Sequence, residues 1–199
     1  EFNLWASSSQ CDLYRRNNFY DLQHIAYTAY LTDGDAFALF RRKAPDFNMP
    51  YSIRIQLIEA NRVSNPLGQG YMGTLGPWAV EMRGPNGNRI INGVEIADDG
   101  EIKAFWISSK VPYDPTDFQP TTWTRVEAFG ARTGRPNILQ ICHDTRAEQY
   151  RGVPYLAPVL ETLKQVSRYT RAELTSAIIK SFFALFFTST NTGADLNAI

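Results

Sequence analysis

The stretch YRGVPYLAPVLETLKQVSRYTRAEL, residues 150–174, joins a strand-like region to the longest periodic apolar segment of the chain. Its two prolines, Pro154 and Pro158, lie where the first turns of a helix would be, and a missing backbone N–H costs least there. Apolar residues then keep near-helical spacing at Leu160, Leu163, Val166, Tyr169, Leu174 and Ile178. The pattern predicts a helix from about Pro154 to Phe187, roughly 50 Å long at about 1.5 Å per residue.

A helix of this length exceeds the usual three or four turns, and a sheet of short strands cannot cover all of it. Its far end is apolar nearly all round, with Phe182, Phe183, Leu185, Phe186 and Phe187. Such a surface has to be buried. We therefore expect its cover to come from the rest of a longer chain or from another subunit.

Upstream of this stretch the pattern changes to a helix followed by strands. Asn18 is a plausible N-cap for a helix with Phe19, Leu22, Ile25, Ala26, Ala29 and Tyr30 on one face. The turn at residues 33–35 stops that helix. Strands are expected from Ala36 and from Ser52. In the second strand, alternation predicts that Arg54 and Gln56 lie on the wet face.

The middle of the chain reads as antiparallel strands with short connections. Residues 61–87 are rich in Gly, Pro and Asn and indicate a long loop or flap. A hairpin follows, with RIINGVEI and EIKAFWISS as strands and Gly100 in the turn. Two further strands are expected in TTWTRVEAF (121–129) and NILQICHD (137–144). The prediction is an α+β fold: a mostly antiparallel sheet, an N-terminal helix and one long C-terminal helix, divided into 1–150 and 151–199.

Composition excludes several classes of protein. Twenty basic and twenty acidic residues balance, so no basic surface is available to grip nucleic acid. The apolar run 177–187 contains Lys180 and Ser181 and is far shorter than the roughly 20 residues of a membrane span. Two cysteines do not make a disulfide framework, so a reducing cytoplasm is expected. The start at Glu1 and the polar end TSTNTGADLNAI suggest a fragment of a longer protein.

No pattern in the sequence predicts catalysis, a metal or a cofactor. His24 and His143 are far apart and lack a second ligand at helical spacing. Cys142 is next to His143 and Asp144, but neighbours in a strand point to opposite faces. The glycines of residues 68–76 neither follow a clear strand nor precede a helix, which argues against a phosphate site. Glu95, Asp98 and Asp99 surround a hairpin turn, where acids are usually solvated.

Charged residues also precede the long helix. Arg146, Glu148 and Arg151 form an ion-pair network, contact a neighbouring subunit, or remain solvated. The sequence does not choose among these alternatives.

Several stretches, in order, resemble the phage portal proteins of the lambda type. The first contains Trp5, Ala6, Asp12, Leu22, Gln23, Asp33 and Gly34. The second and third are IQLIEANRV (55–63) and INGVEIADDGEIKAFWI (91–107). The fourth is the opening stretch, with Arg146, Gln149, Arg151, Gly152, Val153, Pro154, Leu156, Ala157 and Pro158, followed by AEL at 172–174.

The resemblance implies a structural role rather than an enzymatic one. Portal proteins form a ring, commonly a dodecamer, at one vertex of the viral head, and double-stranded DNA passes through it without sequence specificity. Terminase, capsid and head–tail adaptor proteins are the implied partners. The implied location is the virion, of an active phage or a prophage, with assembly in the host cytoplasm. Residues 1–150 then resemble a portal wing, and 151–199 begin a region directed toward the stem.

Two physical arguments agree with this resemblance. A ring places each subunit between two copies, so a heterologous interface buries apolar surface that a single chain leaves uncovered. A nearly neutral protein also avoids strong phosphate contacts that would hold sliding DNA. The expected subunit-interface residues are Arg146, Gln149, Arg151, Phe182, Phe183 and Phe186. The alternatives are another phage tail or baseplate module and a hydrolase that uses Asp98 or Glu95.

Overall fold

The computed structural model describes residues 1–66, 81–111 and 120–187. The chain divides into two units, Glu1–Tyr155 and Leu156–Ile199. This boundary lies close to the division expected at residue 150, and the assignment of wing-like and stem-directed parts stays a prediction. Much of the loop expected over 61–87 lies outside the described residues.

The first unit begins with helices held by local capping. Helix α1 (Phe2–Ser7) and the 3-10 helix η1 (Ser9–Cys11) precede helix α2 (Phe19–Asp33). The Asn18 side chain accepts a hydrogen bond of 2.9 Å from the backbone N–H of Asp21, which is an N-cap. Gly34 ends the helix with a φ of 93°, a left-handed conformation that glycine adopts without a Cβ clash. Both ends of α2 agree with the sequence prediction.

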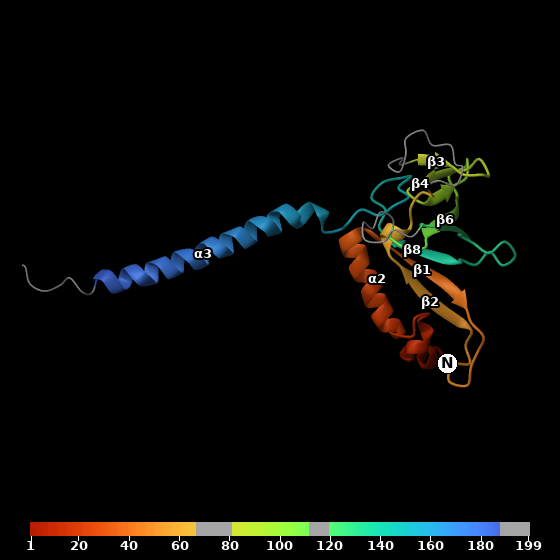
Figure 1. The fold of residues 1–199 in the computed structure, drawn as a ribbon, viewed down its shortest axis with the longest axis horizontal. Helices are drawn as coiled ribbons and strands as arrows, with labels where there is room; N and C mark the ends of the chain where they lie inside the picture. Colours follow the sequence, from red (N-terminus) through yellow and green to blue (C-terminus); the bar gives the residue numbers. More distant parts are fainter. Residues whose placement is uncertain (67–80, 112–119, 188–199) are drawn as a thin grey trace, which may run out of the picture. The chain divides into compact units, whose positions relative to one another are not determined.

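A first sheet packs beside these helices (Figure 1). Its antiparallel strands lie in the order β2 (Ile53–Ile58), β1 (Asp35–Arg42) and β8 (Ile138–Cys142). In the register, Leu39 pairs with Gln56 on one side and with Ile138 on the other. Strand β1 is central because it pairs with β2 along one edge and with β8 along the other. Strand β8 comes from a much later part of the chain than β1 and β2.

A second antiparallel sheet follows the order of the chain. Its strands are β3 (Glu81–Arg83), β4 (Arg89–Ile91), β5 (Val94–Ile96), β6 (Ile102–Ser108) and β7 (Trp123–Glu127). The expected continuous strand over RIINGVEI is wrong, because Asn92 and Gly93 break it into β4 and β5. Both residues have positive φ, 47° and 85°, as a tight hairpin turn requires.

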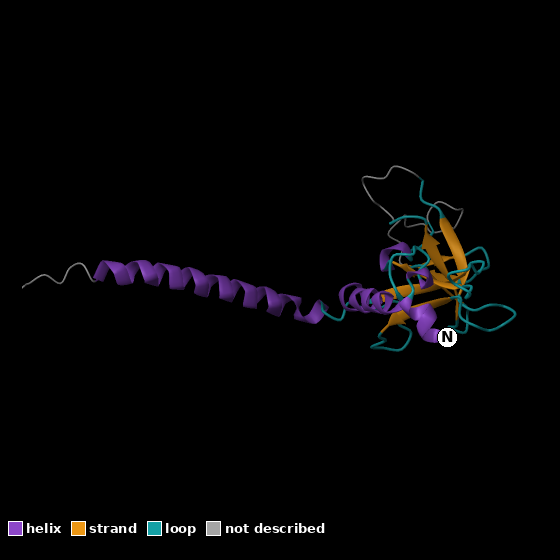
Figure 2. Ribbon diagram, turned by 90° about the horizontal axis from the view of Figure 1, so that it is seen from below, coloured by secondary structure: helices purple, strands orange, loops and turns teal. Residues whose placement is uncertain are grey.

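Two clusters of apolar side chains hold the layers together. One lies between the sheets and contains Phe37, Leu39, Ile58, Val63, Val94, Ile96, Phe105, Ile107 and Ile138. The other packs the opposite side of the first sheet against the N-terminal helices, through Trp5, Ala6, Cys11, Leu22, Ala38, Met49 and Ile55. Figure 2 shows the helices and strands of this arrangement. The predicted α+β class is confirmed.

The expectation that Arg54 and Gln56 face water is wrong, because both are buried, with 1% and 9% exposure. The segment after η1 adds to the edge of β2, where the Leu13 N–H donates to the Ile55 carbonyl at 2.8 Å. Gln56 Nε2 donates to the hydroxyl of Tyr14 at 2.7 Å. Arg54 Nη1 donates to the carbonyl oxygens of Tyr51 and Ile53. The partner of Gln56 therefore comes from 42 residues earlier in the chain, whereas the hydrogen-bond partners of Arg54 are local.

The second unit contains the long helix α3 (Leu160–Phe187), which continues from the 3-10 helix η4 (Ala157–Val159). The helix exists as predicted, but the expected start at Pro154 is wrong, because the structure holds Pro154 outside the helical turns. At about 1.5 Å per residue, its 28 residues span about 42 Å. In the part of the chain that the structure describes, no helix is both long and apolar enough to cross a membrane.

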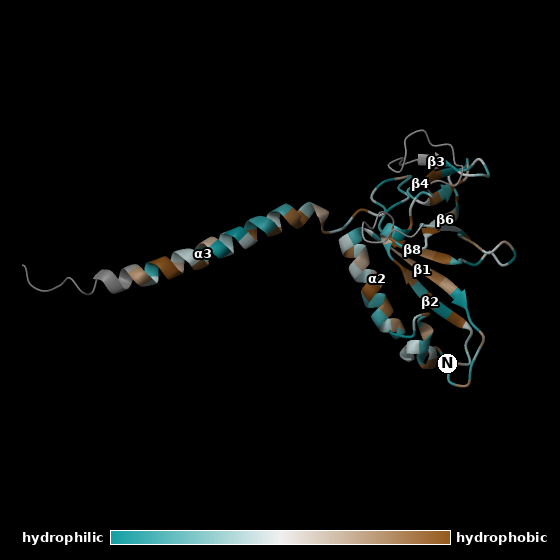
Figure 3. Cartoon of the chain, viewed as in Figure 1, coloured by the Kyte–Doolittle hydropathy of each residue, from teal (hydrophilic) through white to brown (hydrophobic). Residues whose placement is uncertain are grey.

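Apolar side chains on α3 are exposed along its length. They alternate with polar residues (Figure 3) and comprise Leu160, Leu163, Val166, Tyr169, Leu174, Ile178, Ile179 and Phe182. Phe182 is 65% exposed, whereas the side chains of Phe183 and Phe186 lie outside the described residues. An isolated helix with this much exposed apolar surface needs a partner to be stable in water.

Candidate functional site

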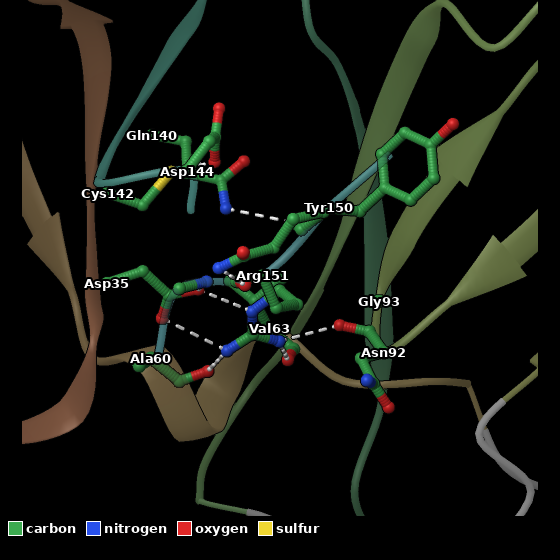
Figure 4. A network of polar contacts seen from close by, with 12 residues as sticks. Asp35, Ala60, Val63, Asn92, Gly93, Gln140, Cys142, Asp144, Tyr150 and Arg151 are labelled. Carbon is green, nitrogen blue, oxygen red and sulfur yellow. Dashed lines mark hydrogen bonds and ion pairs between the residues drawn. The ribbon is translucent and has the colours of Figure 1, made fainter. Parts of the chain in front are cut away.

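The first unit ends in a segment, Tyr150–Tyr155, that we call the exit segment because the chain leaves the unit there. Its centre is the guanidinium of Arg151, which is surrounded by acceptors (Figure 4). Nε and Nη2 donate to the two carboxylate oxygens of Asp35 at 2.6 and 3.2 Å. Nη1 donates to the carbonyls of Val63 and Asn92 at 2.7 and 2.6 Å. Nη2 also donates to the Ala60 carbonyl at 2.9 Å. These five bonds match the five N–H donors of arginine.

Asp35 is the buried partner of this arginine. It is the first residue of β1, and it is 1% exposed. Besides the paired guanidinium nitrogens, it accepts a hydrogen bond of 3.1 Å from the backbone N–H of Gly152. The Arg151 side chain is 21% exposed, and its guanidinium carbon lies 5.4 Å from the centre of the Phe37 ring. A buried ion pair stabilises a fold only when its remaining donors and acceptors are satisfied, and here they are.

The acceptors of Arg151 come from both sheets. Asp35 begins β1 of the first sheet, and Ala60 and Val63 follow its strand β2. Asn92 lies in the turn between β4 and β5 of the second sheet. One side chain therefore ties the exit segment to both sheets at once. The point at which the chain leaves the first unit is fixed by this network.

Two glycines allow the close approach that this network needs. A Cβ placed on Gly152 would lie 1.8 Å from the carbonyl oxygen of Gly34, and a Cβ on Gly34 would lie 2.5 Å from the carbonyl carbon of Val153. Both distances are far below van der Waals contact with backbone atoms that cannot turn away. The end of α2 and the exit segment therefore pack backbone against backbone.

Replacing Gly152 with alanine should lower the free energy of unfolding by about 2–3 kcal/mol, because the new methyl group forces the two backbones apart. The separation would also lengthen the hydrogen bond from the Gly152 N–H to Asp35. Denaturant unfolding of the purified protein measures this loss. Val153→Ala is the matched control, since Val153 is 58% exposed, and its effect should stay within about 0.5 kcal/mol. Equal effects of both substitutions would contradict the proposed clash.

Other contacts hold the remainder of the exit segment. Gln140 of β8 donates through Nε2 to the Tyr150 carbonyl at 3.0 Å. Gln149 accepts from Thr145 and donates through Nε2 to the Arg151 carbonyl at 3.0 Å. The ring of Tyr155 lies 6.2 Å from that of Tyr30 on α2. The segment thus contacts α2 and both sheets.

The structure separates the residues expected at a subunit interface. Arg146 is exposed and Gln149 is half-buried, whereas the donors of Arg151 are used inside the first unit. Of the alternatives left open for Arg151, the ion pair is the one observed. Its partner is Asp35, 116 residues earlier, rather than the neighbouring Glu148. An interface role for Arg146, Gln149, Arg151, Phe182, Phe183 and Phe186 stays a prediction.

The carboxylates around the hairpin turn do not form a pair. Glu95 is completely buried, and it accepts from Arg125 Nε and Nη2 at 2.7 and 3.0 Å. Asn88 Nδ2 and Trp106 Nε1 complete its contacts at 2.8 and 3.2 Å. Asp98 and Asp99 are exposed in the turn. A catalytic Glu95 would have to reach a substrate. Its carboxylate is fully buried and accepts hydrogen bonds from four N–H groups, so a substrate has no access to it.

Stability should fall in acid because of Glu95. Burial on its own raises the pKa of this carboxyl, but the hydrogen bonds from Arg125, Asn88 and Trp106 outweigh burial and hold the pKa below its usual value. The resulting stability is present above the unfolded-state pKa of about 4.3 and is lost as pH falls through the lower folded-state pKa. Urea unfolding between pH 7 and pH 3 measures the loss. The Glu95→Gln variant should lose less stability over the same range, and an equal slope would contradict the assignment.

The sequence Cys142–His143–Asp144 does not form a nucleophilic site. Burial first, and the nearby Asp144 carboxylate second, raise the pKa of the Cys142 thiol to about 11. The thiol lies 3.6 Å from Asp144 Oδ1. His24 and His143 are both exposed. Within residues 1–66, 81–111 and 120–187, no group of three His, Cys, Asp or Glu side chains is placed to hold a metal ion.

Alkylation of Cys142 at pH 7.5 should be about 100-fold slower than that of an ordinary exposed thiol, because only the thiolate reacts. The rate should still be rising above pH 9. Iodoacetamide labelling followed by mass spectrometry measures it, with Asn86→Cys as an exposed reference position in the turn before β4. A Cys142 rate equal to that of the reference would show a reactive thiol.

Comparison with known proteins finds similarity that spans both units of the chain. The family described as "Phage portal protein, lambda family" matches residues 1–198. A probable portal protein of Halomonas phage phiHAP-1 is 25% identical over 178 residues, which cover 89% of this chain and 30% of that protein. The chain thus spans less than a third of the length of this relative. With a family match over nearly every residue, the chain belongs to the lambda family of phage portal proteins.

Proposed function

We propose that this chain is part of a phage or prophage portal subunit. The full subunit forms a ring at one vertex of the capsid, and double-stranded DNA is packaged and ejected through that ring. The observation that carries the proposal is the family match over residues 1–198. The role is structural: the protein is a conduit and a docking surface, not an enzyme.

The exposed surface of α3 supports assembly into a ring. Its apolar side chains from Leu160 to Phe182 have no cover within the described part of their own unit. A closed ring gives every subunit two identical neighbours, so the same heterologous contact covers this surface in each copy.

The charge balance supports passage of DNA without sequence recognition. Each lysine or arginine that pairs with a phosphate strengthens binding and slows release. A chain with twenty basic and twenty acidic residues has no net excess of such groups. The subunit belongs to the virion and assembles in the host cytoplasm, with terminase, capsid and head–tail adaptor proteins as partners.

Electron microscopy of the full-length protein, together with co-purification, tests the proposal. Purified full-length protein should appear as closed rings with a central opening. The large terminase subunit should co-purify with it from infected or induced cells. Monomers alone at high protein concentration would contradict the proposal. Co-purification of tail or baseplate proteins in place of terminase would favour the alternative structural role.

A further inference from the structure

Two Asn-Gly pairs lie in turns of the second sheet. Asn86 and Gly87 lie between β3 and β4, and Asn92 and Gly93 lie between β4 and β5. Asparagine is a thermolabile residue, and a following glycine makes it especially labile because no side chain shields the next peptide nitrogen. The two pairs have the same sequence, and both asparagines are exposed. Only the contacts of their backbones distinguish them.

Deamidation is the reaction to which such pairs are prone, and it needs no enzyme. The peptide nitrogen after the asparagine loses its proton and bonds to the side-chain amide carbon, ammonia leaves, and a cyclic imide remains. Water then adds to one of the imide carbonyls. Addition at the side-chain carbonyl gives aspartate, and addition at the main-chain carbonyl gives isoaspartate, in which the chain runs through the side chain. The peptide nitrogen must therefore be free to lose its proton, and the peptide must be free to rotate.

The backbone around Asn92 is not free in either respect. The N–H of Gly93 donates to Asn65 Oδ1 at 2.7 Å in a buried contact. The Asn92 carbonyl accepts from Arg151 Nη1 at 2.6 Å (Figure 4), and the Gly93 carbonyl accepts from the backbone N–H of Trp106 at 2.8 Å. Gly93 is packed so closely that a Cβ on it would lie 2.5 Å from a backbone nitrogen. Rotation of this peptide would break these hydrogen bonds in a buried place, where lost bonds are costly.

Within the described residues, the backbone around Asn86 is held by its own turn. The N–H of Gly87 donates to the Gly84 carbonyl at 3.0 Å. The Gly87 carbonyl accepts from the exposed side chain of Arg83 at 3.3 Å. A Cβ on Gly87 would meet no described atom within 4 Å. An exposed turn with so few contacts opens at little cost in free energy, so the nitrogen of Gly87 can reach the Asn86 side chain.

We propose that Asn86 is a site of spontaneous deamidation in the folded protein, whereas the fold protects Asn92. The Gly87 nitrogen gives its proton to solvent, bonds to Asn86 Cγ and displaces ammonia. Water then opens the imide to aspartate or isoaspartate at position 86. Water is the sole co-reactant, and nothing is oxidised or reduced. The reaction does not depend on assembly of a ring.

The modification would change the β3–β4 hairpin. Either product adds a negative charge near Arg83, and isoaspartate also lengthens the backbone of the turn. Across this turn the N–H of Gly84 donates to the Asn88 carbonyl at 2.8 Å. Asn88 in turn donates through Nδ2 to the buried Glu95. A longer backbone between Gly84 and Asn88 would therefore disturb the closing hydrogen bond of the hairpin beside a buried carboxylate.

Incubation of the full-length protein at mildly alkaline pH, followed by tryptic digestion and mass spectrometry, tests the assignment. Trypsin cleaves after Arg83, Arg89 and Lys103, so the two asparagines fall on separate peptides. In the folded protein, position 86 should convert from amide to acid at least about 10-fold faster than position 92, because the latter must first open its hydrogen bonds. Part of the product should be isoaspartate, which elutes separately. In protein unfolded by urea, the two rates should become similar.

The Asn65→Ala variant tests the cause of the protection. It removes the acceptor of the Gly93 N–H, so the rate at position 92 should rise at least about threefold, while the rate at position 86 stays the same and serves as the internal reference. Equal rates at both positions in the folded wild-type protein would overturn the proposal. So would a folded protein that is inert at position 86 although the unfolded chain reacts there. Because these comparisons use the wild-type chain, they decide the matter even if the variant does not fold.

Discussion

Replacing Arg151 with methionine should lower the free energy of unfolding by about 3–5 kcal/mol, because it leaves the carboxylate of Asp35 buried without its cation. The substitution keeps much of the side-chain volume, so packing over Phe37 changes little. Asp35 would retain the hydrogen bond from the Gly152 N–H. The carbonyls of Ala60, Val63 and Asn92 would each lose a donor. Denaturant unfolding followed by circular dichroism measures the change.

Matched variants separate the ion pair from general effects of losing an arginine. Arg146→Met removes an exposed arginine that precedes Arg151 in the same connection, and it should change stability by less than about 0.5 kcal/mol. Adding Asp35→Asn to Arg151→Met removes the stranded charge and should recover about 1–3 kcal/mol. Equal stability of Arg151→Met and Arg146→Met would contradict the structural role of the network.

Replacing Arg125 with methionine should also cost about 3–5 kcal/mol at neutral pH, since it leaves the fully buried carboxylate of Glu95 unpaired. Asn88 and Trp106 would remain as donors. Without the guanidinium, burial raises the pKa of Glu95 above its unfolded value. A raised pKa destabilises the fold as pH rises above the unfolded-state value, so the cost should be larger at pH 8 than at pH 5.

Urea unfolding at both pH values measures this difference. Arg132→Met removes an exposed arginine in the connection after β7 and serves as the control, with a change within about 0.5 kcal/mol at either pH. A cost for Arg125→Met that does not depend on pH would show that Glu95 is not the charge left behind.

Local signals in the sequence account for the elements that were predicted correctly. Asn18 and Gly34 bound α2 through an N-cap and a left-handed residue, and both act within one turn of the helix. The apolar spacing after Leu160 likewise predicts α3. The break at Asn92 and Gly93 was also readable, because an Asn-Gly pair between apolar runs is a strong hairpin signal. It was missed because the flanking residues read as one strand.

Long-range contacts explain what the sequence did not reveal. Arg54 and Gln56 look like the wet side of an amphipathic strand, but both are buried, and Gln56 is hydrogen-bonded to Tyr14, 42 residues earlier. The pairing of Arg151 with Asp35 joins positions 116 residues apart. No local pattern encodes such a pair. Gly34 and Gly152 indicate a close approach of two backbone segments only when the structure shows that the two residues are neighbours.

The mass of the intact assembly tests the central claim most directly. Native mass spectrometry of the full-length protein measures how many subunits associate without relying on the appearance of particles. If the protein is a portal subunit, one assembly should dominate the spectrum, and its mass should be one fixed multiple of the subunit mass, as a closed ring requires. A spectrum that contains only the monomer mass at concentrations well above those needed for capsid assembly would contradict the claim.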